Sequence, residues 1–531
     1  MPITRRQLLL GGASALVLAA CSGDDDGGDA APGSSSTAPS SPTTRPAATP
    51  LTADPFGLGV ASGDPDETGV VLWTRLLGAD GDHDVVWEVL HVGPGPSGPA
   101  EERGDERERR VAATGVVTAT AATGHAVHAV VDGLDADSWY EYRFLTGTFT
   151  SPRGRTRTTP RGEDGDRLRF AFGSCQDWQR GFYSAHEHLA AEAVDVVVFL
   201  GDYIYEGGPT GAEGAPRRVD AAEVITLEDY RGRYALYRSD PNLQAAHAAA
   251  PWFVVWDDHE VDNNYAGMIP EPGAPDVDFA ARRAAAYRAW WEHMPTRLPA
   301  PDGPDLPIHR ALRWGGLATV LGLDGRQHRD EQPCDRGGGD LGAGCEERDD
   351  PARSMLGAEQ EAWLAEELSS STAAWNVIAN QTIFSPAGIP VGPTEVFNRD
   401  QWDGYPAARD RALDAMAAAR GDVVIVTGDI HASAVADVRR GDEVVAVELV
   451  GPAISSSFPA QYADLFEAAA DAAGAAMVDA RHNGYVVCEV AGDEMTAAYR
   501  YVDTVQEPTS AIRTASTWRI AAGRVGVEPL A

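Results

Sequence analysis

The chain has 531 residues, enough for two or more domains, and its hydrophobic and charged fractions of 43% and 23% are ordinary for a globular protein. Asp and Glu outnumber Lys and Arg by 80 to 43, which gives a formal charge of -37. This charge repels the phosphate backbone of nucleic acids and therefore disfavours a nucleic-acid-binding protein. If so acidic a protein handled anions, bound cations would have to reverse the charge at its site.

The N-terminal residues indicate an export signal. Residues 4–9 form a twin-arginine pattern, and the apolar run that follows, residues 8–20, is too short for an ordinary transmembrane span. The run ends in Leu-Ala-Ala-Cys21, which resembles a bacterial lipobox. We therefore expect residues 1–21 to be a signal peptide that engages the twin-arginine translocase, with Cys21 as the lipidated residue.

This signal predicts an exported protein. We expect a lipid anchor at the outer face of the cell membrane through Cys21, as the only membrane contact, or secretion after cleavage. The alternative is an ordinary secretory signal, in which the arginines are its positive region and the alanines its cleavage site.

Composition divides the rest of the chain into three parts. Residues 22–52 contain almost no large apolar side chains and are expected to form a disordered tether. Residues 53–155 contain short alternating segments separated by Gly, Asp and Pro, which predict a small all-β domain like an immunoglobulin or fibronectin domain. Its predicted strands are residues 70–74, 85–89, 126–131 and 139–144.

Residues 165–531 have the pattern of an α/β domain, in which apolar strands buried on both faces alternate with Ala-rich helices. The predicted strands are residues 168–172, 194–200, 252–256, 318–323, 375–379, 423–427 and 444–450. The predicted amphipathic helices are residues 279–293 and 358–368.

Several of these strands are followed by side chains that bind metals. They are Cys175, Asp202 with Tyr205, residues 257–260, and Asp429 with His431. In open α/β sheets, ligands bind beyond the carboxyl ends of the strands, so these segments can converge. A thiolate, a phenolate and an imidazole suit a ferric ion, and carboxylate and carbonyl oxygens suit calcium or magnesium.

Each segment alone has an ordinary explanation. Gly-Asp at 201–202 is typical of a turn, Cys175 of a small buried residue, and residues 257–260 of a solvated loop or a helix cap. His431 and Tyr205 taken singly are typical of structural side chains. Their joint occurrence after apolar strands favours a metal site, in which Asp202 is the candidate bridge between two ions.

The strand-end motifs together resemble those of the PhoD-like phosphatases, distant relatives of purple acid phosphatases and other calcineurin-like phosphoesterases. They are Gly-Ser-Cys at 173–175, Gly-Asp-Tyr-Ile-Tyr-Glu at 201–206, Trp-Asp-Asp-His-Glu-Val at 256–261 and Gly-Asp-Ile-His at 428–431. Ala-Ser-Gly-Asp-Pro at 61–65 and Val-Leu-Trp-Thr-Arg at 71–75 extend the resemblance to the first domain. It implies a layered β-sandwich metallophosphoesterase core with helices on both sides.

The resemblance also implies the roles of site residues. The ligands of Fe3+ would be Cys175, Asp202, Tyr205 and His431. The ligands of Ca2+ would be Asp202, Asp258, Asp429 and an amide at Asn380 or Gln381. The expected catalytic residues are Asp202 and His259, and the latter would orient or protonate the phosphate. Further residues would either bind a second calcium or build the loop; they are Asp257, Glu260, Asp262 and Asn263.

The expected activity is that of an alkaline phosphatase for phosphate scavenging, which hydrolyses small phosphate monoesters and diesters by metal-activated water. Three alternatives stay open at this point. They are a phosphodiesterase or phospholipase D-like enzyme of the same family, a zinc hydrolase, and a non-catalytic cell-surface binding protein.

Two of the remaining cysteines, Cys334 and Cys345, flank a Gly-rich acidic loop. Since the export signal places them in an oxidising compartment, we expect a local disulfide between them. Cys488 lies in an alternating segment and is expected to be a buried strand residue.

Overall fold

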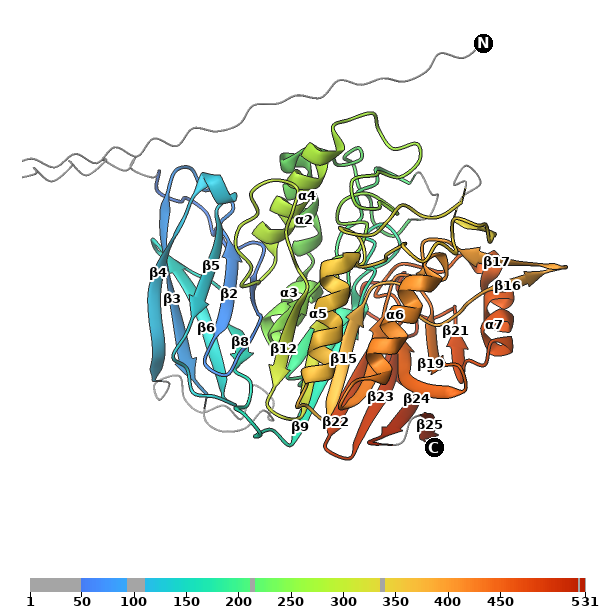
Figure 1. Cartoon of the computed structure of the whole chain (residues 1–531). Helices are drawn as coiled ribbons and strands as arrows, with labels where there is room; N and C mark the ends of the chain where they lie inside the picture. Colours follow the sequence, from blue (N-terminus) through green and yellow to red (C-terminus); the bar gives the residue numbers. More distant parts are fainter. Residues whose placement is uncertain (1–48, 93–109, 211–214, 335–339, 524–525, 531) are drawn as a thin grey trace, which may run out of the picture. The chain divides into compact units, whose positions relative to one another are not determined.

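The computed structural model describes residues 49–92, 110–210, 215–334, 340–523 and 526–530 (Figure 1). The signal peptide expected at residues 1–21, its lipidation site Cys21 and most of the tether expected at residues 22–52 lie outside the described residues. No helix in the described part of the chain is long and apolar enough to cross a membrane.

The first β region consists of two layers around one core. The outer layer is a sheet of β4 (Val111–Ala119), β3 (His83–His91), β6 (Trp139–Thr146), β7 (Phe149–Thr150) and β8 (Gly154–Arg157). The other layer is formed by β1 (Val60–Gly63), β2 (Val70–Arg75) and β5 (Ala126–Val131). Apolar side chains of both layers, such as Leu72 and Tyr142, share the core between them. The region is all-β, as predicted.

The three inner strands also join a larger sheet, which the sequence pattern does not reveal. Gly63 of β1 pairs in parallel with Trp252 of β11 (Trp252–Val254). The ten-stranded sheet continues through β10 (Val196–Phe199), β9 (Arg167–Gly173), β22 (Gly484–Ala491), β23 (Glu494–Val502), β24 (Ile512–Ala521) and β25 (Val527–Leu530). Strands β9, β10 and β11 run parallel, so their carboxyl ends lie at one edge of the sheet.

A seven-stranded sheet supplies the second layer of the α/β region. Its order is β12 (Arg310–Trp314), β13 (Ala318–Gly322), β15 (Trp375–Asn380), β18 (Asp422–Thr427), β20 (Glu443–Val450), β19 (Ser433–Arg440) and β21 (Met477–Asp479). A small sheet of β14 (Leu341–Ala343), β17 (Thr394–Asn398) and β16 (Ile389–Val391) is separate from it.

Alternation along the central strands explains why the sheets stack. Val377 of β15 packs in the core shared by the two large sheets, whereas its neighbour Ile378 packs in a second core on the opposite face. Val424 and Ile425 of β18 divide between the two cores in the same way. Since successive strand residues point to opposite faces, apolar residues at every position produce a sheet covered on both sides.

Helices cover the outer faces of the layers. The second core is closed by α5 (Gly357–Ser370) and α6 (Pro406–Ala417), which lie side by side over β15 in Figure 1. The other helices are α1 (Ser184–Leu189), α2 (Leu227–Arg238), α3 (Pro241–Ala249), α4 (Phe279–His293) and α7 (Ala463–Ala472). Helix α4 has the predicted bounds, and α5 extends its prediction by one or two residues at each end.

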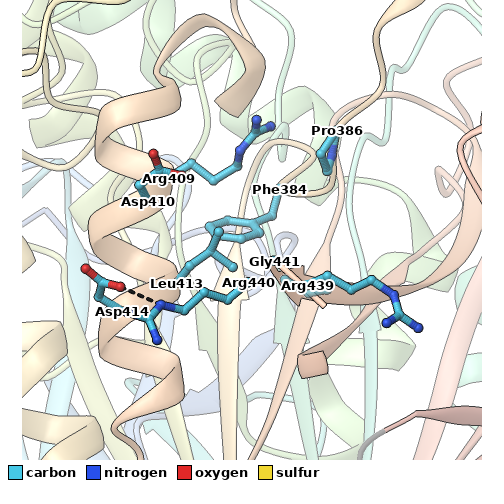
Figure 2. Close-up of a pocket in the computed structure, with 10 residues that line it drawn as sticks. Phe384, Pro386, Arg409, Asp410, Leu413, Asp414, Arg439, Arg440 and Gly441 are labelled. Carbon is cyan, nitrogen blue, oxygen red and sulfur yellow. Dashed lines mark ion pairs between the residues drawn. The ribbon is translucent and has the colours of Figure 1, made fainter. Parts of the chain in front are cut away.

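A hollow of about 440 Å³ lies between α6 and the turn that joins β19 to β20 (Figure 2). Its lining includes three arginines, and each has an acidic partner; that of Arg439 is Asp437, at 3.4 Å. Arg409 pairs with Asp403 at 2.6 Å and Arg440 with Asp414 at 2.7 Å.

Candidate metal centre

The candidate ligands lie in the loops that follow four strands. Cys175 follows β9 and Asp202 follows β10, and the two loops are held together because the Cys175 amide donates to the Gly201 carbonyl at 3.1 Å. Gly201 has a φ of 115°, and a side chain there would collide with the backbone nitrogen of Asp257, 2.4 Å from its Cβ. A glycine is therefore needed to bring the loops after β10 and β11 together.

Four candidate ligands share an unusual backbone conformation. The φ angles of Cys175, Asp202, Asp429 and His431 are 59°, 54°, 64° and 57°. Residues other than glycine rarely adopt this left-handed region, and such strained positions cluster at functional sites. The shared conformation indicates that the fold holds these side chains in place at a cost in backbone energy.

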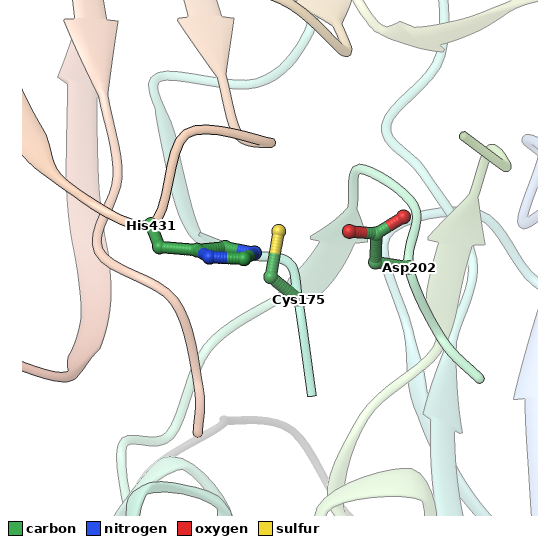
Figure 3. A group of neighbouring side chains, drawn as sticks. All are labelled: Cys175, Asp202 and His431. Atoms are coloured by element: carbon green, nitrogen blue, oxygen red, sulfur yellow. The ribbon is translucent and has the colours of Figure 1, made fainter. Parts of the chain in front are cut away.

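The thiol, one carboxylate and one imidazole meet at a single point. Figure 3 shows Cys175, Asp202 and His431 pointing toward one another from three segments, and one potential ligand atom of each lies within 4.8 Å of the others. The Tyr205 hydroxyl adds a fourth donor atom, 2.9 Å from Asp202 Oδ2 and 3.1 Å from His431 Nε2. This donor set fits the ligand chemistry expected for a ferric ion.

Asp202 also belongs to a second group. It gathers with Asp258 and His259, again with one potential ligand atom of each within 4.8 Å of the others. Oδ1 of Asp202 and Oδ1 of Asp258 are buried and accept no hydrogen bond from the described residues. Burial and the charge of Asp258 raise the pKa of Asp202 well above its usual value, although His259 opposes the shift. Since neither carboxylate oxygen accepts a hydrogen bond from a residue that the structure describes, both would gain from a bound cation, so the site fits two neighbouring ions.

A third acidic group surrounds a positively charged side chain, that of Arg326. Asp257, Asp258 and Asp429 gather around the guanidinium of Arg326, whose side chain is fully buried. Nε of Arg326 donates to Asp257, and Nη2 lies 3.5 Å from both Asp258 Oδ1 and Asp429 Oδ1. Nη1 binds both carboxylate oxygens of Asp400, at 2.9 and 2.8 Å. Arg326 thus neutralises part of this cluster and forms ion pairs with two of the candidate ligands, Asp258 and Asp429.

His259 is oriented by a carboxylate outside the metal groups. Its Nδ1 lies 2.7 Å from Oε2 of Glu206, and its ring packs on Tyr205 with 4.1 Å between centroids. Burial lowers the pKa of His259, but Glu206, Asp202 and Asp258 outweigh this effect and raise it well above the usual value. Since Nδ1 forms a hydrogen bond with Glu206, the Nε2 hydrogen of the imidazolium is available to a ligand.

Comparison with known proteins agrees with this geometry. A family model described as PhoD-like phosphatase matches residues 170–499, and the model of the N-terminal domain of these phosphatases matches residues 41–160. The chain belongs to the PhoD-like phosphatase family. It is 41% identical over 493 residues to alkaline phosphatase D of Bacillus subtilis, a match that covers 89% of this chain and 82% of that protein.

Solved structures support the same assignment. A structure of PhoD matches with a TM-score of 0.83 at 39% identity and covers 91% of this chain and 93% of its own. The purple acid phosphatase PPD1 of yellow lupin seeds matches with a TM-score of 0.53 at 11% identity, covering 87% of this chain and 74% of its own. The second match shows the shared fold alone. The predicted layered metallophosphoesterase core after an all-β region is thereby confirmed.

Several predicted residues of this PhoD-like chain build the loop rather than face the clustered ligands. The Glu260 carboxylate accepts hydrogen bonds from the amides of Asp202, Tyr203 and Asp257. Asp262 pairs with Arg282 at 3.1 Å, and the Asn263 side chain donates to Glu271 at 2.6 Å. These contacts favour a role in building the loop over a role in binding a second calcium.

The amides expected near calcium have other partners. Oδ1 of Asn380 accepts from Trp402, and Oε1 of Gln381 accepts from the Gly325 amide, at 3.1 Å each. The structure instead brings Gln401 to the site, where its Nε2 donates to Asp429 Oδ2 at 2.6 Å. Asn380 and Gln381 lie at the end of β15 as predicted, but a strand end alone does not determine where an amide points.

Sequence reasoning missed four residues of the site. They are Glu206, Arg326, Gln401 and Ser456. Glu206 ends a recognised motif, which was a usable signal, whereas Arg326 and Gln401 lie in loops without a distinctive pattern. Ser456 donates through Oγ to the Tyr205 hydroxyl at 2.7 Å. Cys334 and Cys345 are disulfide-bonded, and Cys488 is buried in β22.

Proposed function

We propose that this protein is an exported, metal-dependent alkaline phosphatase and phosphodiesterase that hydrolyses small phosphate monoesters and diesters. The observation that carries the proposal is the convergence of Cys175, Asp202, Tyr205 and His431 beside the carboxylates of Asp258 and Asp429. The name of the Bacillus subtilis relative, alkaline phosphatase D, supports the same reaction class.

The proposed cofactors are Fe3+ and Ca2+. Iron is assigned to the thiol, phenol and imidazole group, and calcium to the neighbouring carboxylates, with Asp202 shared between them. Zinc fits less well because carboxylates outnumber histidines and because the Cys175 and Tyr205 pair favours iron.

The protein contributes orientation and proton donation to the reaction. Bound iron and calcium would supply positive charge for the phosphate oxygens and lower the pKa of a water molecule. His259, held by Glu206, directs its Nε2 hydrogen toward the substrate, where it stabilises a phosphate oxygen or protonates the departing alkoxide. Arg326 and Gln401 hold the carboxylates of Asp258 and Asp429 in position.

The test compares three substrates at alkaline pH with elemental analysis of the freshly purified protein. The proposal expects iron and calcium in the protein and turnover of p-nitrophenyl phosphate and bis-p-nitrophenyl phosphate. Faster turnover of phosphatidylcholine would favour the phospholipase D-like alternative. A folded protein that holds both metals but hydrolyses none of the three would contradict the proposal, and an inert, metal-free folded protein would favour a binding role.

Export remains part of the proposal. The twin-arginine pattern supports transport by the twin-arginine translocase, and Cys21 supports a lipid anchor at the outer face of the membrane, a location suited to phosphate scavenging. Replacing Cys21 by Ala is expected to move the protein from the membrane fraction to the soluble fraction. An unchanged membrane fraction would argue against lipidation.

A further inference from the structure

A second hollow, of about 300 Å³, borders the metal centre. Its lining includes His431, a candidate iron ligand, and Ser456, whose Oγ lies 2.7 Å from the Tyr205 hydroxyl. Its volume is at the lower end of the range for small-molecule sites. The hollow near α6 (Figure 2) contains no residue of the metal centre, so it is not the place where the ester is cleaved.

One wall of the second hollow is apolar, whereas the other lining residues are polar; these are His431, Ser456, Ser457, Arg481, His482 and Asn483. Phe458, Ala463 and Ala480 belong to the apolar wall, and behind them Phe466 packs on the Phe458 ring with 5.0 Å between centroids. Phe458, Ala463, Ala480 and Phe466 belong to one small apolar cluster. This apolar wall favours the carbon skeleton of a ligand over its charged groups.

The rim carries more negative than positive charge. Arg481 is shared between Asp464 and Glu467, the second at 2.9 Å. One guanidinium facing two carboxylates leaves no free positive charge for an anion.

His482 links one further carboxylate to a second arginine. Its Nδ1 lies 2.8 Å from Asp479, and its Nε2 lies 3.1 Å from Nη2 of Arg513. Around the rim, the three carboxylates of Asp464, Glu467 and Asp479 face the two guanidiniums of Arg481 and Arg513.

Given the proposed function, we infer that this hollow is a leaving-group pocket that receives the alcohol part of the phosphate ester and selects against alcohols with a second negative charge. In the reaction, a water oxygen bonds to phosphorus and the ester P–O bond breaks. Its electron pair stays on the alkoxide oxygen, which takes up one proton, while the attacking water gives up one proton. The released alcohol occupies the pocket beside His431. The contact of its carbon skeleton with the apolar wall contributes to binding, and the negative charge of the rim contributes to selectivity.

The first experiment fills the pocket. Ala460 is an exposed residue of its lining, so Ala460→Trp adds bulk without disturbing the core. Ala468→Trp is the matched control, since Ala468 is exposed on α7 and does not line the pocket. We expect Ala460→Trp to raise KM for phenyl phosphate about fivefold or more, with little change for methyl phosphate. The control should have the KM of the wild type for both.

The second experiment tests charge with two esters of nearly the same shape, 4-carbamoylphenyl phosphate and 4-carboxyphenyl phosphate. We expect a higher kcat/KM for the neutral leaving group. The double variant Asp464→Asn with Glu467→Gln should reduce this preference about threefold to fivefold at low salt, because it removes two rim charges.

The outcomes distinguish a failure of the pocket proposal from a failure of the proposed function. If the wild type turns over both esters, Ala460→Trp has no effect and the double variant keeps the same preference, only the pocket proposal is overturned. A metal-loaded wild type that hydrolyses neither ester would overturn the proposed function and the pocket with it. The expected pair of shifts supports both.

Discussion

At the residue scale, the site depends on side chains whose type was visible in the sequence and whose conformation was not. The sequence showed a Cys, a Tyr, a His and several Asp after apolar strands. Their left-handed backbone angles, such as 54° at Asp202, arise from contacts between loops that are distant in the chain. The same holds for the contact between Glu206 and His259, which are 53 residues apart.

Replacing Tyr205 by Phe tests the phenolate ligand. An iron-bound phenolate gives a charge-transfer absorption, so we expect a coloured wild type and a variant that loses the visible band. Tyr203→Phe is the control, because the Tyr203 hydroxyl points to His247, at 2.8 Å, rather than to the metal groups. An unchanged visible spectrum in Tyr205→Phe would remove this residue from the ligand set.

Replacing Glu206 by Gln tests the orientation of His259. The variant keeps the shape but removes the carboxylate that holds Nδ1 and favours the imidazolium. We expect kcat to fall about 10- to 100-fold, with the metal content unchanged. Steady-state kinetics with bis-p-nitrophenyl phosphate measures this, and a wild-type kcat would show that the contact has no catalytic role.

At the element scale, one buried arginine links three loops. Arg326, after β13, binds Asp257 after β11 and Asp400 after β17. The strand and helix positions were predictable from periodicity, as the agreement of α4 and of the central strands shows. The pairing of β1 with β11 and the position of Arg326 were not, because both depend on contacts between segments far apart in sequence.

Replacing Arg326 by Met tests this linkage. The variant leaves Asp257 buried without its ionic partner and Asp400 with a weaker one, so we expect a loss of about 3 to 5 kcal/mol in the free energy of unfolding. Arg313→Met is the control, because the exposed pair of Arg313 with Glu367 contributes at most about 1 kcal/mol. Equal losses in the two variants, measured by denaturant unfolding, would contradict the role of Arg326.

At the scale of the whole molecule, we expect the bound metals to offset the destabilising effect of ionised carboxylates that are buried in the fold. Without a cation, burial raises the pKa of Asp429 from 3.8 to about 7, although Arg326 opposes the shift. The metal-free folded state therefore favours the protonated carboxyl, and it loses stability as the pH rises through 7. With metals bound, the carboxylate faces a cation and this loss disappears.

We accordingly expect metals to raise the unfolding temperature more at pH 8 than at pH 6. Scanning calorimetry of metal-loaded and chelated protein at both pH values gives the difference, and buried histidines such as His128 affect both forms alike. A metal effect at pH 8 that is equal to or smaller than that at pH 6 would contradict the assignment.

The most direct test of the account is the metal content of two matched variants. Asp202→Asn and Asp262→Asn both replace a buried carboxylate with an isosteric amide, but only Asp202 lies in the two ligand groups. We predict that Asp202→Asn loses iron, calcium and turnover of bis-p-nitrophenyl phosphate, whereas Asp262→Asn retains them. An Asp202→Asn protein with both metals and wild-type turnover would contradict the proposed metal centre.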